Sequence, residues 1–186
     1  MSEIGRAALF GKLNSQAYKA IEGATVFCKL RGNPYVELVH WVQQILNGAD
    51  SDLHRIVRHF ELDASRLSTD ITDALDRLPR GATSISDLSP HVENAVERGW
   101  VYATLLFGDS RVRTGYLVVG ALKTPSLRNA LVAISRQFER IQPDVLTDDF
   151  SRIVGGSPED ALTASDGPTA GPGEASGAMP PAQLGR

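Results

Sequence analysis

The chain carries, at residues 13–30, the stretch LNSQAYKAIEGATVFCKL, and it carries a related stretch, LSPHVENAVERGWVYATL, at residues 88–105. The two align without a gap when the residue numbers are offset by 75. Apolar residues in both recur at intervals of three and four, which predicts two amphipathic helices. The identical pairs are Leu13/Leu88, Ala20/Ala95, Glu22/Glu97, Val26/Val101 and Leu30/Leu105. The chain therefore contains an internal repeat, and this repeat decides the fold.

The repeat continues downstream of both stretches. With an offset of 76, VHWVQQIL (39–46) lies over GYLVVGAL (115–122), and with an offset of 79, residues 63–75 lie over residues 142–154. The matching positions are largely those predicted to be buried, and the gaps fall in predicted loops. We therefore predict an all-α fold in which two four-helix units, 13–78 and 88–154, pack as a pseudo-twofold pair into one cooperative domain.

The two ends of the chain have no counterpart in the repeat. Residues 1–12 place Ile4, Ala7, Ala8 and Leu9 at helical spacing, so we expect a short extra N-terminal helix that docks on the bundle or on a partner. Residues 155–186 contain seven Gly, five Pro and no aromatic residue. Such a composition buries too little apolar surface to offset the entropy of ordering, so we predict a disordered linker there.

Charge and composition exclude several classes of partner. The net charge is −3 over the whole chain, and residues 155–186 carry all of it, so residues 1–154 are neutral. A neutral body without a basic run argues against nucleic acid, against a helix-turn-helix regulator and against an electrostatic membrane patch. The single cysteine, Cys28, excludes an intrachain disulfide, and the N-terminus lacks a signal-peptide core, so we expect a cytoplasmic protein.

The sequence offers no catalytic constellation. A Walker motif is missing, because Gly11-Lys12 is followed by Leu13 and has no upstream glycine at the required spacing. The four histidines do not have zinc spacing, and no G-x-S-x-G motif occurs. We interpret Cys28, Trp41 and Trp100 as core residues, and we predict that the chain holds no metal and is not an enzyme.

Three landmarks resemble the Clp N-terminal domain of the Hsp100 AAA+ unfoldases: LNSQAYKAIEGA near residue 13, the second helix VELVHWVQQIL, and LSTDITDALDRLP at the end of the first repeat. The likeness covers residues 13–154, which would form a double Clp-N repeat. The extra segment AALFGKL and the stretch RGWVYATLLFGDSRVRTGYLV are most similar to the ClpV (TssH) branch, whose members disassemble contracted type VI secretion sheaths.

The resemblance implies a substrate-recruitment domain that carries no chemistry of its own. Its partner would be an amphipathic N-terminal helix of the large sheath subunit (TssC/VipB-like), bound in a hydrophobic groove. The groove residues that we predict are Leu9, Phe10, Leu13, Ala17, Leu88, His91 and Val92. The repeat-matched residues Leu13 and Leu88 are equally compatible with a purely structural role in the core, and His91 with a helix-terminus role.

The resemblance also implies how the domain is used. The isolated domain would be monomeric and the parent protein hexameric, with ATP and Mg²⁺ bound only by AAA+ modules that lie outside this chain. The alternative within the same family is a general Clp N-domain that binds unfolded protein segments or an adaptor.

Overall fold

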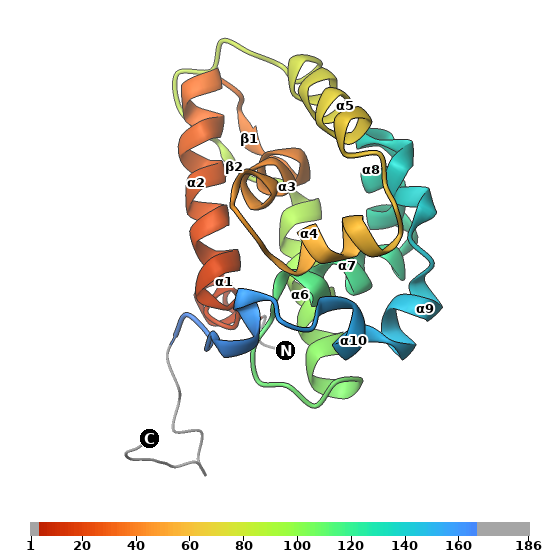
Figure 1. Ribbon diagram of the computed structural model, residues 1–186. Helices are drawn as coiled ribbons and strands as arrows, with labels where there is room; N and C mark the ends of the chain where they lie inside the picture. Colours follow the sequence, from red (N-terminus) through yellow and green to blue (C-terminus); the bar gives the residue numbers. More distant parts are fainter. Residues whose placement is uncertain (1–3, 167–186) are drawn as a thin grey trace.

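The computed structural model describes residues 4–166, and its first repeat has the four predicted helices (Figure 1). Three of them have an N-cap side chain directly before their first residue: Asn14 accepts from Ala17 N, and Ser51 and Asp63 cap two later helices. The helices are α2 (Ser15–Arg31), α3 (Leu38–Asn47), α4 (Asp52–His59) and α5 (Ala64–Asp76).

The second repeat follows the same order with one difference. A single helix that starts at Pro143 would complete the predicted four-helix unit, but the structure interrupts it at Asp149, whose φ of −113° and ψ of 23° lie outside the helical region. A short 3₁₀ turn also precedes it. The elements are α6 (Pro90–Leu105), α7 (Thr114–Leu122), α8 (Pro125–Ile134), η1 (Arg136–Arg140), α9 (Pro143–Asp148) and α10 (Phe150–Val154).

A two-stranded sheet joins the two repeats, and a short helix near the N-terminus packs on the second repeat. Strand β1 (Tyr35–Val36) pairs in parallel with β2 (Asp87–Leu88), so each repeat contributes one strand at the start of a helix. The predicted extra helix is present as α1 (Arg6–Phe10), which packs on α6. Neither strand was predicted, because two residues are too few to show an alternating pattern.

The repeats interlock rather than lie side by side as separate bundles. Helix α4 of the first repeat packs against α7 and α10 of the second, and α8 of the second packs against α3 and α5 of the first. The two sets of contacts become equivalent when the repeats are exchanged, as the predicted pseudo-twofold arrangement requires. Leu13, Ile56, Val96, Leu127 and Leu146 are all completely buried in the shared core. The all-α tandem-repeat prediction is therefore confirmed.

The predicted boundary at residue 154 differs from the structure. Residues 155–166 run from α10 past α4 and α7 to α1, and they include a 3₁₀ turn, η2 (Pro158–Ala161) (Figure 1). The segment ends in backbone hydrogen bonds from Ser165 N to Leu13 O (2.6 Å) and from Asp166 N to Gly11 O (3.0 Å). The rest of the predicted linker, residues 167–186, lies outside the described residues, as do residues 1–3.

Within residues 4–166 no single helix is long and apolar enough to cross a membrane. Helices α7 and α8 meet the length and composition only as a pair bent by 108°.

Candidate functional site

Three of the predicted groove residues lie in the core. Leu13, Ala17 and Val92 have no exposed surface. They belong to the positions at which the repeats match in sequence, and such positions are selected for packing between helices. These residues therefore lie behind the surface and do not form its exposed face, which differs from the prediction.

The other four predicted residues lie on two separate faces. Leu9 and Phe10, on α1, are 9% and 7% exposed, and Phe10 lines a groove beside α2. Leu88 is half-buried in β2. His91 is exposed on α6 and borders a different hollow of about 200 Å³, between α3, α5 and α8. The predicted set therefore does not form one continuous groove.

A groove of about 440 Å³ lies between α1, the start of α2 and the end of the described chain, and we refer to it as the α1–α2 groove. Ala7, Phe10 and Tyr18 supply its apolar surface, while Lys19 and Glu22 supply charges at its edge. It is lined by Ala7, Phe10, Gly11, Ser15, Tyr18, Lys19, Glu22, Ser165 and Asp166. Small residues on α1 allow close approach of another helix, which suits a helix-in-groove mode of binding.

Ion pairs hold α1 in place as one wall of this groove. Arg6 contacts Asp87 Oδ1 of β2 at 2.8 Å and Glu93 Oε1 of α6 at 3.0 Å. The hydrogen bond from Arg6 lowers the pKa of Asp87 below its usual value. Lys12, just after α1, pairs with Asp166 Oδ2 at 3.4 Å and lies 5.5 Å from the centre of the Trp100 ring. A helix of only five residues is thereby fixed to the second repeat.

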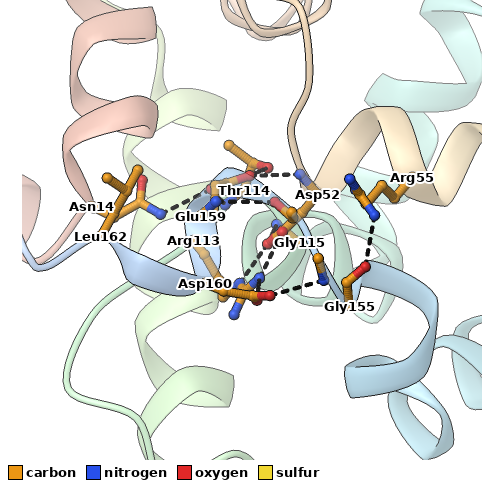
Figure 2. Close-up of polar contacts among 12 residues, drawn as sticks. Asn14, Asp52, Arg55, Arg113, Thr114, Gly115, Gly155, Glu159, Asp160 and Leu162 are labelled. Atoms are coloured by element: carbon orange, nitrogen blue, oxygen red, sulfur yellow. Dashed lines mark hydrogen bonds and ion pairs between the residues drawn. The ribbon is translucent and has the colours of Figure 1, made fainter.

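The C-terminal segment, which supplies Ser165 and Asp166 to the groove, also contains a buried carboxylate, Glu159, at which the N-termini of three helices meet (Figure 2). Its Oε1 accepts from Asn14 Nδ2 (2.9 Å) and Thr114 N (2.7 Å), and its Oε2 accepts from Asp52 N (2.7 Å) and Thr114 Oγ1 (2.5 Å). These donors belong to the starts of α2, α4 and α7, whose helix dipoles favour a negative charge there. Burial, followed by the nearby charge of Asp52, raises the pKa of Glu159.

A buried ion-pair cluster continues from Glu159. Arg113 Nε and Nη2 donate to Asp52 at 2.6 and 2.8 Å, and Nη2 also donates to Asp160 Oδ1 at 2.7 Å (Figure 2). Burial is the largest single influence on Arg113 and opposes its charge, but the hydrogen bonds and charges of Asp52 and Asp160 together outweigh burial and raise the pKa of Arg113. Arg111 also donates to the carbonyl of Leu162.

The Glu159 cluster is structural rather than catalytic. Glu159 and Asp52 have no exposed surface, so a substrate has no path to them. Sequence reasoning missed the cluster because Glu159 lies in a stretch rich in Gly and Pro. The available signal was Ser157-Pro158, which repeats the hydroxyl-cap and proline pattern of Ser89-Pro90; Ser157 does cap η2.

Among residues 4–166 no group of three or more His, Cys, Asp or Glu side chains is placed to bind a metal ion.

Comparison with known proteins shows which class of protein has this fold. A solved complex of a ClpV N-domain with a VipB peptide has the same fold, with a TM-score of 0.72 and 23% identity over 86% of this chain and 97% of that one. The "Chaperone protein ClpB" of Yersinia enterocolitica is 48% identical over 95% of this chain. No protein-family model matches the chain. The chain thus has the fold of the helical N-terminal domains of Clp-type ATPases.

Relatives of higher sequence identity show to which branch of this class the chain belongs. A solved structure described as "Coevolution of the ATPase ClpV, the TssB-TssC Sheath and the Accessory HsiE Protein Distinguishes Two Type VI Secretion Classes" is 68% identical, has a TM-score of 0.83, and is matched over 86% of this chain and 98% of its own. The "AAA+ ATPase ClpV1" of Pseudomonas aeruginosa is 66% identical over all of this chain. The chain belongs to the ClpV N-terminal domain family. It spans about a fifth of the length of the curated relatives that it matches.

Proposed function

We propose that this chain is the substrate-recruitment domain of a type VI secretion sheath-disassembling AAA+ unfoldase. It binds an amphipathic N-terminal helix of the large sheath subunit (TssC/VipB-like) in the α1–α2 groove. The domain itself is monomeric, cytoplasmic and without a cofactor, and the parent protein is a hexamer whose AAA+ modules bind ATP and Mg²⁺.

The observation that carries this proposal is the α1–α2 groove itself. Helix α1 has no counterpart in the second repeat, and Arg6 fixes it where Ala7 and Phe10 form an apolar wall opposite Tyr18. Charged side chains at the edge leave the apolar surface confined to a strip, which fits the apolar face of one helix. The solved complex of the related ClpV N-domain with a VipB peptide supports the same kind of occupant.

The size of the groove sets the expected strength of binding. One docked helix buries less surface than a standard protein–protein interface, so the affinity should be modest, with a Kd of roughly micromolar, or about −8 kcal/mol. Six domains on one ring would engage a polymeric sheath by avidity, which raises the overall affinity without any new contact.

The direct test is calorimetry with a synthetic peptide that spans the N-terminal segment of the cognate large sheath subunit. Ala7→Arg places a long charged side chain in the groove from an exposed position of α1, so it should weaken binding at least about tenfold while the melting temperature stays native. His91→Arg introduces the same residue on the other face and should leave binding unchanged. The groove is misplaced if His91→Arg abolishes binding and Ala7→Arg does not.

A second candidate function is a general Clp N-domain that binds unfolded segments or an adaptor. The 48% identical relative named a ClpB chaperone favours it. An unfolded casein-like protein that displaces the sheath peptide at similar concentrations would support this candidate, whereas the sheath-recruitment proposal expects no displacement.

A further inference from the structure

A hollow of about 660 Å³ lies away from the α1–α2 groove, among the four helices of the first repeat. We refer to it as the first-repeat cleft. Its lining combines an apolar floor with a polar rim, as expected of a binding surface. Helix α2 contributes Phe27 and Arg31; α3 contributes Gln43, Leu46 and Asn47; α4 and the loop after it contribute His54, Val57, Arg58, Glu61 and Leu62; α5 contributes Ala64, Leu67, Ser68, Ile71, Thr72 and Leu75.

The floor of this cleft is elongated. Leu67, Ile71 and Leu75 are spaced by four residues along α5, so they form a stripe of about 12 Å at the 1.5 Å rise of an α-helix. Phe27 and Leu46 line the cleft as well and are only half-buried. The three side chains of the stripe are only 2–4% exposed, so a ligand would contact their edge together with Phe27 and Leu46. An elongated surface of this kind suits a helical turn or two of a peptide better than a compact small molecule.

The second repeat fills the corresponding space with its own side chains. Ile71 corresponds to Phe150 under the offset of 79, and Leu46 corresponds to Leu122 under the offset of 76. Phe150 packs against Phe107 and Tyr116, with ring centroids 4.8 and 5.0 Å apart. Leu122 is only 5% exposed. The first repeat has no such aromatic cluster at these positions and retains the cleft.

The charges of the cleft are unequal. The lining residues include two guanidinium groups, those of Arg31 and Arg58, and a single carboxylate, that of Glu61. Arg31 contacts Asp76 at 3.0 Å through Nη2, and its guanidinium lies 5.6 Å from the centre of the Phe27 ring. The Arg31 side chain is still 20% exposed, so part of it is open to a carboxylate of a ligand. Arg58 is exposed on the rim.

We propose that the first-repeat cleft is a second peptide-binding site, separate from the α1–α2 groove. Its occupant is an acidic amphipathic helix of another protein. Aliphatic or aromatic side chains at i and i+4 lie on the stripe of α5, and a carboxylate next to them meets Arg31 and Arg58. The inference does not depend on the proposed sheath interaction, because the two sites share no lining residue.

The test uses two designed helical peptides that are identical except that the residues flanking the Leu anchors are Glu in one and Lys in the other. Titration of the isotopically labelled full chain should shift the amide resonances of α2, α4 and α5 with the Glu peptide. The Glu peptide should bind at least about tenfold more tightly than the Lys peptide, and Arg58→Glu should remove or reverse this preference.

Two tryptophan variants fix the location. Ser68 is exposed and lines the cleft, so Ser68→Trp should fill it and abolish binding of the Glu peptide. Ser65→Trp introduces the same side chain on the same helix outside the cleft and should leave binding intact. Ala7→Arg should also leave it intact, so failure of this inference is distinguishable from failure of the sheath proposal.

Several outcomes would overturn the inference. They are equal binding of both peptides, shifts confined to α1 and the start of α2, and unchanged binding to Ser68→Trp. Self-association of the chain that Ser68→Trp abolishes would also overturn it, since a second copy would then be the occupant.

Discussion

The two repeats make an equivalent hydrogen bond beyond their first helices but fill the space beside it differently. Asn33 Oδ1 is hydrogen-bonded to His40 Nε2 at 2.9 Å, and at the equivalent positions the Tyr116 hydroxyl donates to Asp109 Oδ2 at 2.8 Å. A left-handed glycine precedes each pair: Gly32 caps α2 directly, whereas α6 ends at Leu105, before Gly108. The glycines are Gly32 (φ 71°) and Gly108 (φ 61°). These pairs correspond under the offset of 76.

The difference lies in the side chains that surround this shared bond. The second repeat stacks Phe107 on Tyr116 and packs Phe150 against both, whereas the first repeat has Arg31 and Ile71 at the positions of the two phenylalanines. The two repeats thus keep the hydrogen bond beyond their first helices, while the side chains that fill their interiors differ. The C-terminal segment contacts both repeats, since Glu159 accepts from Thr114 of the second and from Asn14 and Asp52 of the first.

Of the substitutions that test the comparison of the two repeats, Glu159→Ala should have the largest effect on the free energy of unfolding. The substitution leaves the buried donors of Asn14, Asp52 and Thr114 without an acceptor, so the free energy of unfolding should fall by about 5 kcal/mol. Chemical denaturation measures it, and the exposed Glu97→Ala serves as the control. A loss below about 1 kcal/mol would mean that the Glu159 contacts of residues 155–166 do not stabilise the fold.

The second prediction compares equivalent interior positions. Phe150→Ala should destabilise the fold by about 4 kcal/mol, because it removes a ring packed against two others. Ile71→Ala should cost about 2 kcal/mol, because Ile71 already borders a cleft and has fewer packed neighbours to lose. Urea unfolding of both variants checks the difference. Equal losses would show that the first-repeat interior is as closely packed as the second.

The smallest predicted effect is a pH dependence that belongs to the first repeat alone. Burial, followed by the charge of Arg31, lowers the pKa of His40 from 6.5 to about 4. The unfolded chain therefore binds a proton between about pH 6.5 and 4 that the folded chain does not, so stability is full above pH 6.5 and falls as the pH drops through this window.

Between pH 7 and pH 5 this histidine should account for a loss of about 2 kcal/mol. His40→Gln should flatten that part of the stability profile. Tyr116→Phe, at the equivalent position of the second repeat, should leave the stability profile unchanged. Burial raises the pKa of Tyr116 above its usual value, so Tyr116 does not titrate between pH 7 and pH 5. Parallel profiles for wild type and His40→Gln would exclude His40 as the source.

The helices and the repeat could be predicted from the sequence because both depend on local apolar spacing. Asn14 and Ser89 cap α2 and α6 as their positions suggested. The break at Asp149 was not visible, since the spacing of apolar residues continues through it. The order of residues 155–166 was also missed, because it depends on one carboxylate meeting three distant helix starts rather than on composition.

The site was harder to predict than the fold for a physical reason. Sequence identity between repeats identified Leu13, but a residue that is kept in both copies is kept for their mutual contact. The exposed groove instead lies where residues that are not duplicated, Phe10 of α1 and Ser165 of the C-terminal segment, meet the start of α2. A repeat therefore predicts the scaffold well and its added surfaces poorly.

The position of Ser165 and Asp166 has a mechanical consequence. They form one side of the α1–α2 groove and are held to it by hydrogen bonds to Leu13 and Gly11. A force applied to the chain beyond Asp166 therefore loads these bonds before any helix of the core. Tension transmitted through Asp166 would therefore separate Ser165 and Asp166 from Leu13 and Gly11 first, and would weaken binding in the groove while the two repeats stay folded.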